Sequence, residues 1–228
     1  MSSWSTEDLL GPEGQDWRVP VSELEQRISK LANLLQENNL PGALIQSPVD
    51  LYYYAGGRQN GALFIPATGS KASIESGGDG STFFVRRSIK RAEYEAGGTD
   101  GPINIEKFPS LRILADTLSK MGAEASPALQ KGEIPADFHA KFESVLAPLG
   151  TPADCTQLIH SQREVKSSWE LAMMREGALV QQAMFDSVSN EIAAGKTELE
   201  LVAAAEAISR ESGFGGNIQM RRFPLQCD

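Results

Sequence analysis

The side chains able to act as acids, bases or nucleophiles are few, and none falls into a recognisable catalytic motif. The chain of 228 residues contains two histidines and two cysteines. A histidine titrates near neutrality and can serve as a general base, but neither His139 nor His160 has a partner motif around it. We therefore interpret His139 as a residue on the surface of a predicted helix and His160 as a structural residue.

The two cysteines also predict no chemistry. Cys155 and Cys227 are far apart and match neither a metal-binding nor a redox spacing. Cys155 lies in an apolar stretch, which favours a buried thiol, because a nucleophilic cysteine needs a base and an electropositive setting. Cys227 lies near the end of the sequence, where we expect it to be exposed and oxidisable. We assign no catalytic residue and no metal ligand, and catalysis by a serine, cysteine or histidine has no constellation in its favour.

Two other patterns could bind an anion, and each has a simpler interpretation. A basic cluster at the start of a predicted helix comprises Arg86, Arg87, Lys90 and Arg91. A solvated helix face with ion pairs to Glu93 and Glu95 is the favoured alternative to an anion site there. The glycine-rich segments 77–81 and 213–216 lack the Lys-Ser or Lys-Thr pair of a phosphate loop, so we interpret them as turns.

Composition excludes several classes of partner. Thirty acidic residues against 21 basic ones give a net charge of −9, and a field of that sign repels a phosphate backbone. We therefore expect no nucleic-acid partner. No run approaches the roughly 20 apolar residues that cross a bilayer, and the N-terminus lacks the basic start and apolar stretch of a signal peptide. These patterns predict no membrane association and a cytoplasmic location.

Strands alternate with amphipathic helices over the first two thirds of the chain. Ser22 and Glu25 have the spacing of a capping box before a helix with one apolar face, and Asp50 is expected to cap a short helix that ends before Gly56. The predicted strands are 43–45, 62–66, 82–85, 103–108 and 127–130, with a last short run at 155–159. Further predicted helices are 88–95, 110–121 and 135–146. This alternation predicts an α/β fold, a mixed sheet with helices on both faces.

The last third of the sequence changes to helices. Ser167 with Glu170, and Thr197 with Glu200, have capping-box spacing at the start of two amphipathic helices. The apolar face of the first helix comprises Leu171, Met174, Ala178, Phe185, Val188 and Ile192. These faces must be buried against something, and only one possible strand, near 218–225, follows them. Either the helices pack on the first domain or the chain is the front part of a larger protein.

The order of these elements resembles the creatinase, prolidase and aminopeptidase P family of metallopeptidases. The likeness runs from residue 21 to 228 and is carried by the segments LPGALIQSPVDLYYYAGG, GALFIP, FFVRRSIKRAEYEAG, IHSQREVKSSWELAMMREGALV and GKTELELV. The most telling parts are 83–88 and 163–167 with Glu170 and Arg175. The resemblance implies an N-terminal tail at 1–20, a ribonuclease-H-like α/β domain at 21–160, and the first helices of an incomplete "pita-bread" catalytic domain at 161–228.

The resemblance also implies a chemistry that this sequence does not complete. Family peptidases mostly cleave bonds at proline, using two divalent metal ions, manganese, cobalt or zinc, held by two Asp, two Glu and one His. All five ligand positions would lie beyond Asp228, and neither His139 nor His160 matches one. The resemblance therefore implies a chain that is the N-terminal portion of a proline-directed aminopeptidase or dipeptidase, itself non-catalytic and holding no metal.

The expected role is subunit association, as a homodimer in the parent, and shaping of the active-site entrance. In family members the loop after the tyrosine-rich helix projects toward the active site of a neighbouring subunit, which would place Arg58, Gln59 and Asn60 near a peptide substrate. Arg58 could then meet a substrate carboxylate, although an ordinary polar turn is the simpler interpretation. The alternatives are a free-standing, non-catalytic binding or assembly protein and a relative of the metal-free creatinase-type amidinohydrolases.

Overall fold

The computed structural model describes residues 18–69 and 80–212. The described residues up to Val165 belong to one compact unit, and those from Lys166 onward belong to another. The first unit thus extends to Val165, where the sequence suggested a boundary at residue 160. Most of the predicted tail, the predicted strand at 218–225 and Cys227 lie outside the described residues.

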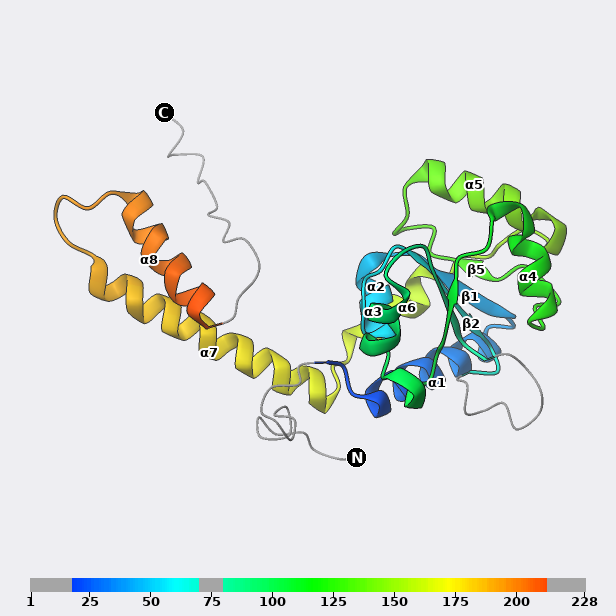
Figure 1. Ribbon diagram of the computed structural model, residues 1–228, viewed down its shortest axis with the longest axis horizontal. Helices are drawn as coiled ribbons and strands as arrows, with labels where there is room; N and C mark the ends of the chain where they lie inside the picture. The colour runs from blue at the N-terminus through cyan, green and yellow to red at the C-terminus, as the bar shows by residue number, and fades with distance from the viewer. Residues whose placement is uncertain (1–17, 70–79, 213–228) are drawn as a thin grey trace. The chain divides into compact units, whose positions relative to one another are not determined.

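A five-stranded mixed sheet forms the centre of the first unit (Figure 1). Its strands are β1 (Gly42–Ile45), β2 (Gly61–Pro66), β3 (Thr82–Val85), β4 (Asn104–Lys107) and β5 (Ala128–Leu129), in the order β4-β3-β2-β1-β5. Strand β2 is antiparallel to both β1 and β3, while β4 is parallel to β3 and β5 is parallel to β1. This confirms the predicted mixed sheet and five of its predicted strands.

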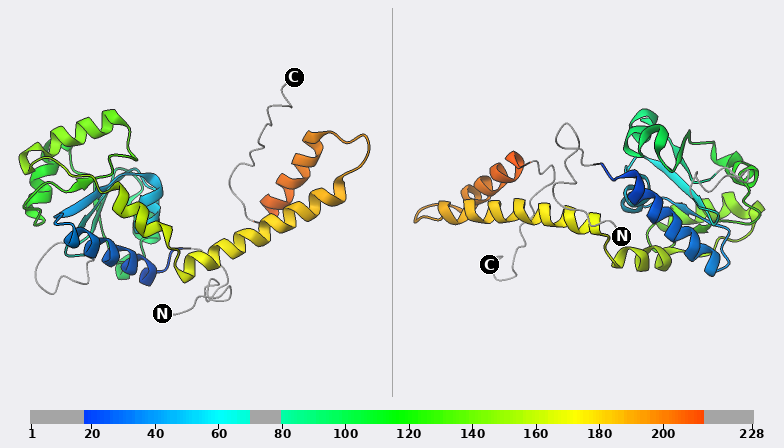
Figure 2. Two further views of the ribbon diagram at one scale, coloured as in Figure 1. Left: turned by 180° about the vertical axis from the view of Figure 1, so that it is seen from behind. Right: turned by 90° about the horizontal axis from the view of Figure 1, so that it is seen from below.

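Helices cover both faces of the sheet, as predicted. On one face lie α1 (Val21–Glu37), α2 (Pro48–Ala55), α3 (Ile89–Glu95) and α6 (Thr156–Glu164), and on the other lie α4 (Leu114–Lys120) and α5 (Ala136–Leu146) (Figures 1 and 2). Short 3-10 turns are η3 (Gly98–Asp100), η4 (Leu111–Ile113) and η5 (Ala147–Leu149).

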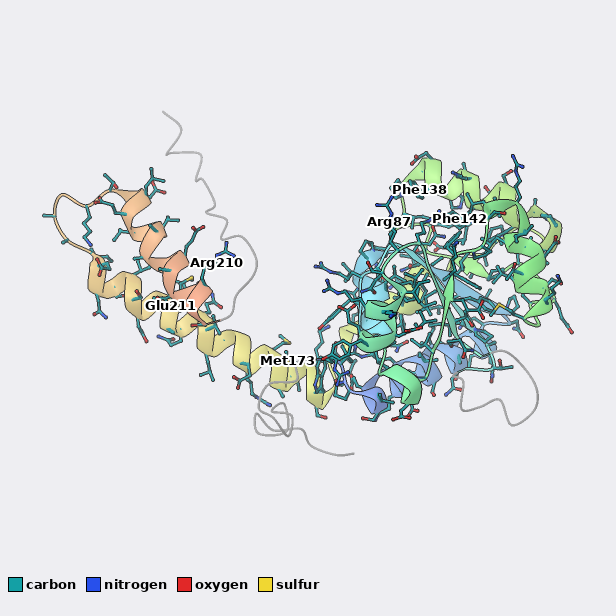
Figure 3. All side chains as sticks on the ribbon, in the orientation of Figure 1. Arg87, Phe138, Phe142, Met173, Arg210 and Glu211 are labelled. Atoms are coloured by element: carbon teal, nitrogen blue, oxygen red, sulfur yellow. The ribbon has the colours of Figure 1, made fainter. Side chains whose placement is uncertain are left out.

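Alternation along the strands divides the core into two clusters. Leu63 and Ile65 of β2 face the cluster under α1 and α2, while Phe64 faces the cluster under α4 and α5. Successive side chains of a strand point to opposite faces, so continuous apolar runs fill both layers. Figure 3 labels Phe142, which is buried in the second cluster, and Phe138, which is exposed on the same helix, α5.

The structure corrects three details of the predicted first unit. Ser22 does not cap α1, which begins at Val21 with Pro20 at the N-cap and without a side-chain cap hydrogen bond. The apolar run 155–159 is not a strand: Asp154 makes an isolated bridge to Leu129, and helix α6 follows. The sequence also predicts that the aromatic groups Tyr52 to Tyr54 and Phe83 to Phe84 build the core. All of them are in the core except Tyr52, which is 42% exposed because it lies on the outer face of α2.

The second unit contains α7 (Ser168–Glu191) and α8 (Glu198–Glu211), which pack against each other. Both predicted capping boxes are present: the hydroxyls of Ser167 and Thr197 accept hydrogen bonds from the backbone N–H of Glu170 and Glu200. Several large apolar side chains of this unit remain exposed, namely Leu171, Met174, Leu179, Phe185, Ile192 and Leu199.

Candidate functional site

A surface pocket of about 590 Å³ lies where α2 ends and α3 begins. Its lining comprises Pro48, Tyr52, Gly56, Gly57, Arg58, Gln59, Ser88, Arg91 and Glu95. The antiparallel register pairs Gly61 with Val85, so the loop before β2 and the loop after β3 lie side by side. A backbone hydrogen bond of 2.8 Å from Arg86 to the carbonyl oxygen of Asn60 joins these two loops.

Two glycines allow the chain to turn at this pocket. Gly56 ends α2 in the left-handed region at φ 71°, and a Cβ there would lie 2.4 Å from the carbonyl oxygen of Glu95. A Cβ on Gly57 would collide with the side chains of Gln59 and Glu95. Glycine is therefore required at position 56 for α3 to approach the end of α2, whereas at position 57 a Cβ would meet only the ends of flexible side chains.

The charges of the pocket are unevenly satisfied. Both carboxylate oxygens of Glu95 are engaged, one by Arg91 Nε at 2.8 Å and the other by the side-chain amide of Gln59. The hydrogen bond and charge of Glu95 raise the pKa of Arg91. Arg58 is exposed and makes no hydrogen bond or ion pair within residues 18–69 and 80–212. One guanidinium thus remains available on this pocket, and Glu95, the only carboxylate that the described residues contribute to its lining, is already paired.

The structure separates the three residues predicted to lie near a substrate. Arg58 and Gln59 line the pocket, and Gln59 holds Glu95. Asn60 lies beside the pocket and contributes its backbone oxygen to the loop contact with Arg86. The trio therefore forms an ordered turn with one free guanidinium, which is compatible with both interpretations of the sequence.

The predicted basic cluster is only partly paired with acidic residues. Arg91 forms the expected ion pair with Glu95. Arg86 instead lies over the ring of Phe108, with its guanidinium carbon 3.9 Å from the ring centroid. The exposed side chains of Arg87 and Lys90 make no ion pair within the described part of the chain.

A buried polar network links α2, α6 and the residue after β5, and sequence patterns did not indicate it. The carboxylate of Asp50 is completely buried and accepts hydrogen bonds from Arg163 at 2.9 Å and from Gln130 at 2.6 Å. Asp50 was expected to cap α2, but no side-chain cap bond forms there. Its partner Arg163 lies more than 100 residues away in the sequence. No local sequence pattern therefore predicts this pair.

A second set of hydrogen bonds fixes α6 to α1 and α2. The hydroxyl of Tyr54 donates to the side-chain oxygen of Gln162 at 3.0 Å, and the amide of Gln162 donates to the backbone oxygen of Arg27 at 2.9 Å. Burial raises the pKa of Tyr54 well above its ordinary value. These groups are buried in the fold and paired with each other, which indicates a structural role.

The histidines and the described cysteine do not form a catalytic arrangement with each other. His160 Nε2 lies 2.7 Å from a carboxylate oxygen of Glu133, and His139 lies 4.0 Å from Glu143 on its own helix. Cys155 is completely buried, and burial raises the pKa of its thiol to about 12. A thiol with this pKa stays protonated near neutral pH, so it is a poor nucleophile.

The described residues do not fit the pair of metal ions that the family resemblance implies. No three histidine, cysteine, aspartate or glutamate side chains among them lie close enough to share an ion. No chemistry routed through a metal can therefore be derived for this part of the chain. Within the same residues, no helix combines the length and apolar character that crossing a bilayer requires.

The Creatinase/Prolidase N-terminal domain family matches residues 27–165. The chain belongs to this family. That match ends at Val165, where the first compact unit also ends. The domain therefore includes the whole sheet, the pocket and helix α6.

Similarity to known proteins extends beyond this domain. The chain is 21% identical to an Xaa-Pro dipeptidase of Pyrococcus furiosus over 193 residues, which is 83% of this chain and 49% of the relative. In fold it resembles an Xaa-Pro dipeptidase from Bacillus anthracis with a TM-score of 0.66 and 17% identity, covering 83% of this chain and 50% of that one. An X-Pro aminopeptidase from Thermotoga maritima gives a TM-score of 0.64 and 16% identity, with 86% and 50% covered. The chain thus spans about half the length of these relatives.

Proposed function

We propose that this chain is the N-terminal portion of a proline-directed peptidase and that it has no hydrolytic activity alone. The observation that carries the proposal is the match to the Creatinase/Prolidase N-terminal domain over 27–165, within a likeness to an Xaa-Pro dipeptidase that continues past that domain. In the parent enzyme, two divalent ions, manganese, cobalt or zinc, would activate water for attack on the peptide bond. Their ligands would come from outside the described residues.

The second unit fits the proposal as the beginning of a pita-bread catalytic domain. Leu171, Met174 and Phe185 of α7 are 41%, 58% and 56% exposed, although they belong to the predicted apolar face of that helix. An amphipathic helix ordinarily buries its apolar face in the folded protein. In the proposed parent enzyme, other elements of the same catalytic domain would cover this apolar face of α7.

The domain that ends at Val165 would serve subunit association and shape the entrance of the active site. Arg58 supports this role, because it is exposed and lacks a partner in the described part of the chain. In a homodimer it would reach a peptide substrate bound by the neighbouring subunit, with Gln59 and Asn60 holding the turn. A cytoplasmic location remains a prediction from the sequence.

Turnover and metal assays on the 228-residue chain test the central claim. We expect no hydrolysis of Ala-Pro or Leu-Pro in the presence of manganese, cobalt or zinc, and no tight stoichiometric uptake of these ions by equilibrium dialysis. Peptide turnover or uptake of one or two ions per chain would contradict the proposal.

A longer protein that joins this chain to metal-ligating segments tests the role of Arg58. Replacing Arg58 by alanine should raise KM for a dipeptide substrate about tenfold or more, because a charged hydrogen bond contributes about 1.5–3 kcal/mol. The exposed Arg112, which lies outside the pocket lining, is the matched control and should leave KM unchanged on replacement by alanine. An unchanged KM for the Arg58 variant removes the substrate contact from the proposal.

A further inference from the structure

We infer that the pocket beside Arg58 is a binding site for a small oxyanion on a compact apolar body, complete within this chain. The inference concerns the loop that the proposed function brings to a neighbouring active site. It rests, however, only on residues of the first unit and needs neither a second subunit nor a metal. The shared chemistry is that of a carboxylate or a phosphate, and the experiment distinguishes the two.

The donors of this site come from the loop before β2 and from the start of α3. Arg58 presents five N–H groups in a planar fork that matches the oxygens of a carboxylate or phosphate. Arg91 uses its Nε on Glu95, which leaves its terminal nitrogens for a ligand. The hydroxyl of Ser88 makes no hydrogen bond to the described residues. Arg58, Ser88 and Arg91 thus offer donors to one pocket that no described residue uses.

The carboxylate in the pocket lining is already paired, so it does not compete with a ligand for Arg58. Among the described residues, Glu95 is the only carboxylate in the lining, and its two oxygens are held by Arg91 and Gln59. The pocket therefore carries a net positive charge on a chain whose formal charge is −9. Arg86, Arg87 and Lys90, which adjoin Ser88 in the sequence, are exposed and add to the positive potential.

The size and the lining of the pocket indicate what kind of molecule would carry the anionic group. A volume of about 590 Å³ falls within the range of small-molecule sites, about 300–1,000 Å³. Pro48 and the exposed ring of Tyr52 give one side of the pocket an apolar surface. A molecule with an aromatic or aliphatic ring and one anionic group matches this combination.

Binding measured on the 228-residue chain by NMR chemical shifts or calorimetry tests the inference with three matched probes. Benzoate carries a carboxylate, phenyl phosphate carries a phosphate on the same ring, and benzamide is the neutral isostere. We expect either oxyanion to bind at least tenfold more tightly than benzamide. Whichever of the two binds more tightly identifies the source of the anionic group.

Variants locate the site and control for unfolding. R58A should weaken oxyanion binding about tenfold or more, R58K should restore part of it, and R112A should leave it unchanged. Circular dichroism spectra of the variants must match that of the parent chain. Equal affinity for benzoate, phenyl phosphate and benzamide, or full binding by R58A, overturns the inference. Neither result depends on peptide turnover, so failure here and failure of the proposed function can be told apart.

Discussion

At the scale of single residues, we expect the buried ion pair between Asp50 and Arg163 to contribute strongly to the stability of the fold. Asp50 is fully buried, whereas the side chain of Arg163 is 32% exposed. Removal of the arginine leaves a buried carboxylate with Gln130 as its remaining partner, and breaking such pairs costs about 3–5 kcal/mol. Since Arg163 is partly solvated, we expect the lower end of this range.

Arg163→Gln should therefore lower the free energy of unfolding by about 3 kcal/mol. Urea denaturation followed by circular dichroism measures this quantity. The control is Arg112→Gln, an exposed arginine whose replacement should change stability by less than about 0.5 kcal/mol. Equal effects of the two substitutions would contradict the structural role of the buried pair.

The thiol of Cys155 predicts how stability depends on alkaline pH. Its pKa rises from 9.0 to about 12 on folding, because burial disfavours the thiolate. The folded state then keeps a proton that the unfolded state loses, so this contribution is complete below pH 9 and is lost as the pH rises toward 12. The raised pKa of Tyr54 acts in the same direction from about pH 10 upward.

Cys155→Ala should therefore make stability less sensitive to pH between 9 and 11. The difference between the variant and the parent chain should change by up to about 1.4 kcal/mol per pH unit. Urea midpoints at pH 8, 9, 10 and 11, with a Cys227→Ser background in both proteins, measure it. Parallel stability curves for the two proteins would show that the thiol does not titrate as described.

At the scale of elements, the capping residues give a direct comparison between pattern and structure. The spacing of Ser22 and Glu25 matches a capping box as well as that of Ser167 and Glu170, but only the second pair forms one. Pro20 takes the N-cap position of α1, and Glu23 instead pairs with Arg27. A capping pattern therefore marks the start of a helix only where its Ser or Thr occupies the N-cap position. Ser167 does so in α7, whereas Ser22 already lies inside α1.

Ser167→Ala should thus cost about 1 kcal/mol of stability in the second unit, whereas Ser22→Ala should be nearly neutral. Thermal unfolding monitored by helical circular dichroism, or hydrogen exchange of the first turn of α7, measures the difference. A loss at Ser22 as large as the loss at Ser167 would contradict the assigned caps.

Strand β2 begins with a glycine that the sheet requires. A Cβ on Gly61 would lie 2.0 Å from the carbonyl oxygen of Phe84 on β3, the residue before its register partner Val85. Gly61→Ala should therefore destabilise the chain by about 2 kcal/mol or more. The measurement is the urea midpoint, with Gly177→Ala on α7 as the control because no atom lies near its Cβ position. An unchanged midpoint for Gly61→Ala would refute this close approach.

Most elements of the first unit could be predicted from the sequence because their signals are local. Apolar runs such as Gly61–Pro66 and Thr82–Val85 fill both faces of a sheet, and periodic apolar residues mark α1. The errors occur where distant residues decide the outcome. Cys155 and Ile159 are apolar enough for a strand, yet they join the core from the N-cap and the first turn of α6. Tyr52 differs from Tyr53 only in the helix face it occupies.

The candidate site was partly predictable for the same reason. Arg58 and Gln59 are conspicuous in sequence because they follow Gly56 and Gly57 in a turn. Ser88 and Arg91 become part of the same pocket only through the pairing of β2 with β3. No sequence pattern indicates that register directly, so the second half of the pocket could not be assigned from the residues alone.

At the scale of the whole molecule, the exposed apolar face of α7 is the feature with the clearest consequence. Met174 and Phe185 are more than half exposed, and Leu171 is 41% exposed. Exposed contiguous apolar surface promotes association and binds apolar dyes. The 228-residue chain should therefore bind the dye ANS and elute partly as large species in gel filtration.

A chain carrying Leu171→Gln, Met174→Gln and Phe185→Gln should show several-fold less ANS fluorescence and elute as a single species. Fluorescence titration and light scattering measure both effects. The control replaces three exposed polar residues of the same helix, Gln182, Asp186 and Ser189, by alanine and should not reduce dye binding. Strong dye binding that persists in the triple glutamine variant would place the apolar surface elsewhere.

The anchoring of α6 determines where the N-terminal domain can be cut for study by itself. A fragment that stops at residue 160 loses Gln162 and Arg163, so the buried hydroxyl of Tyr54 loses its acceptor and the buried carboxylate of Asp50 keeps only Gln130 as a partner. A fragment that continues through Val165 keeps both anchors. We therefore expect the fragment that ends at Val165 to fold, because it keeps these two contacts, and the fragment that ends at residue 160 to unfold.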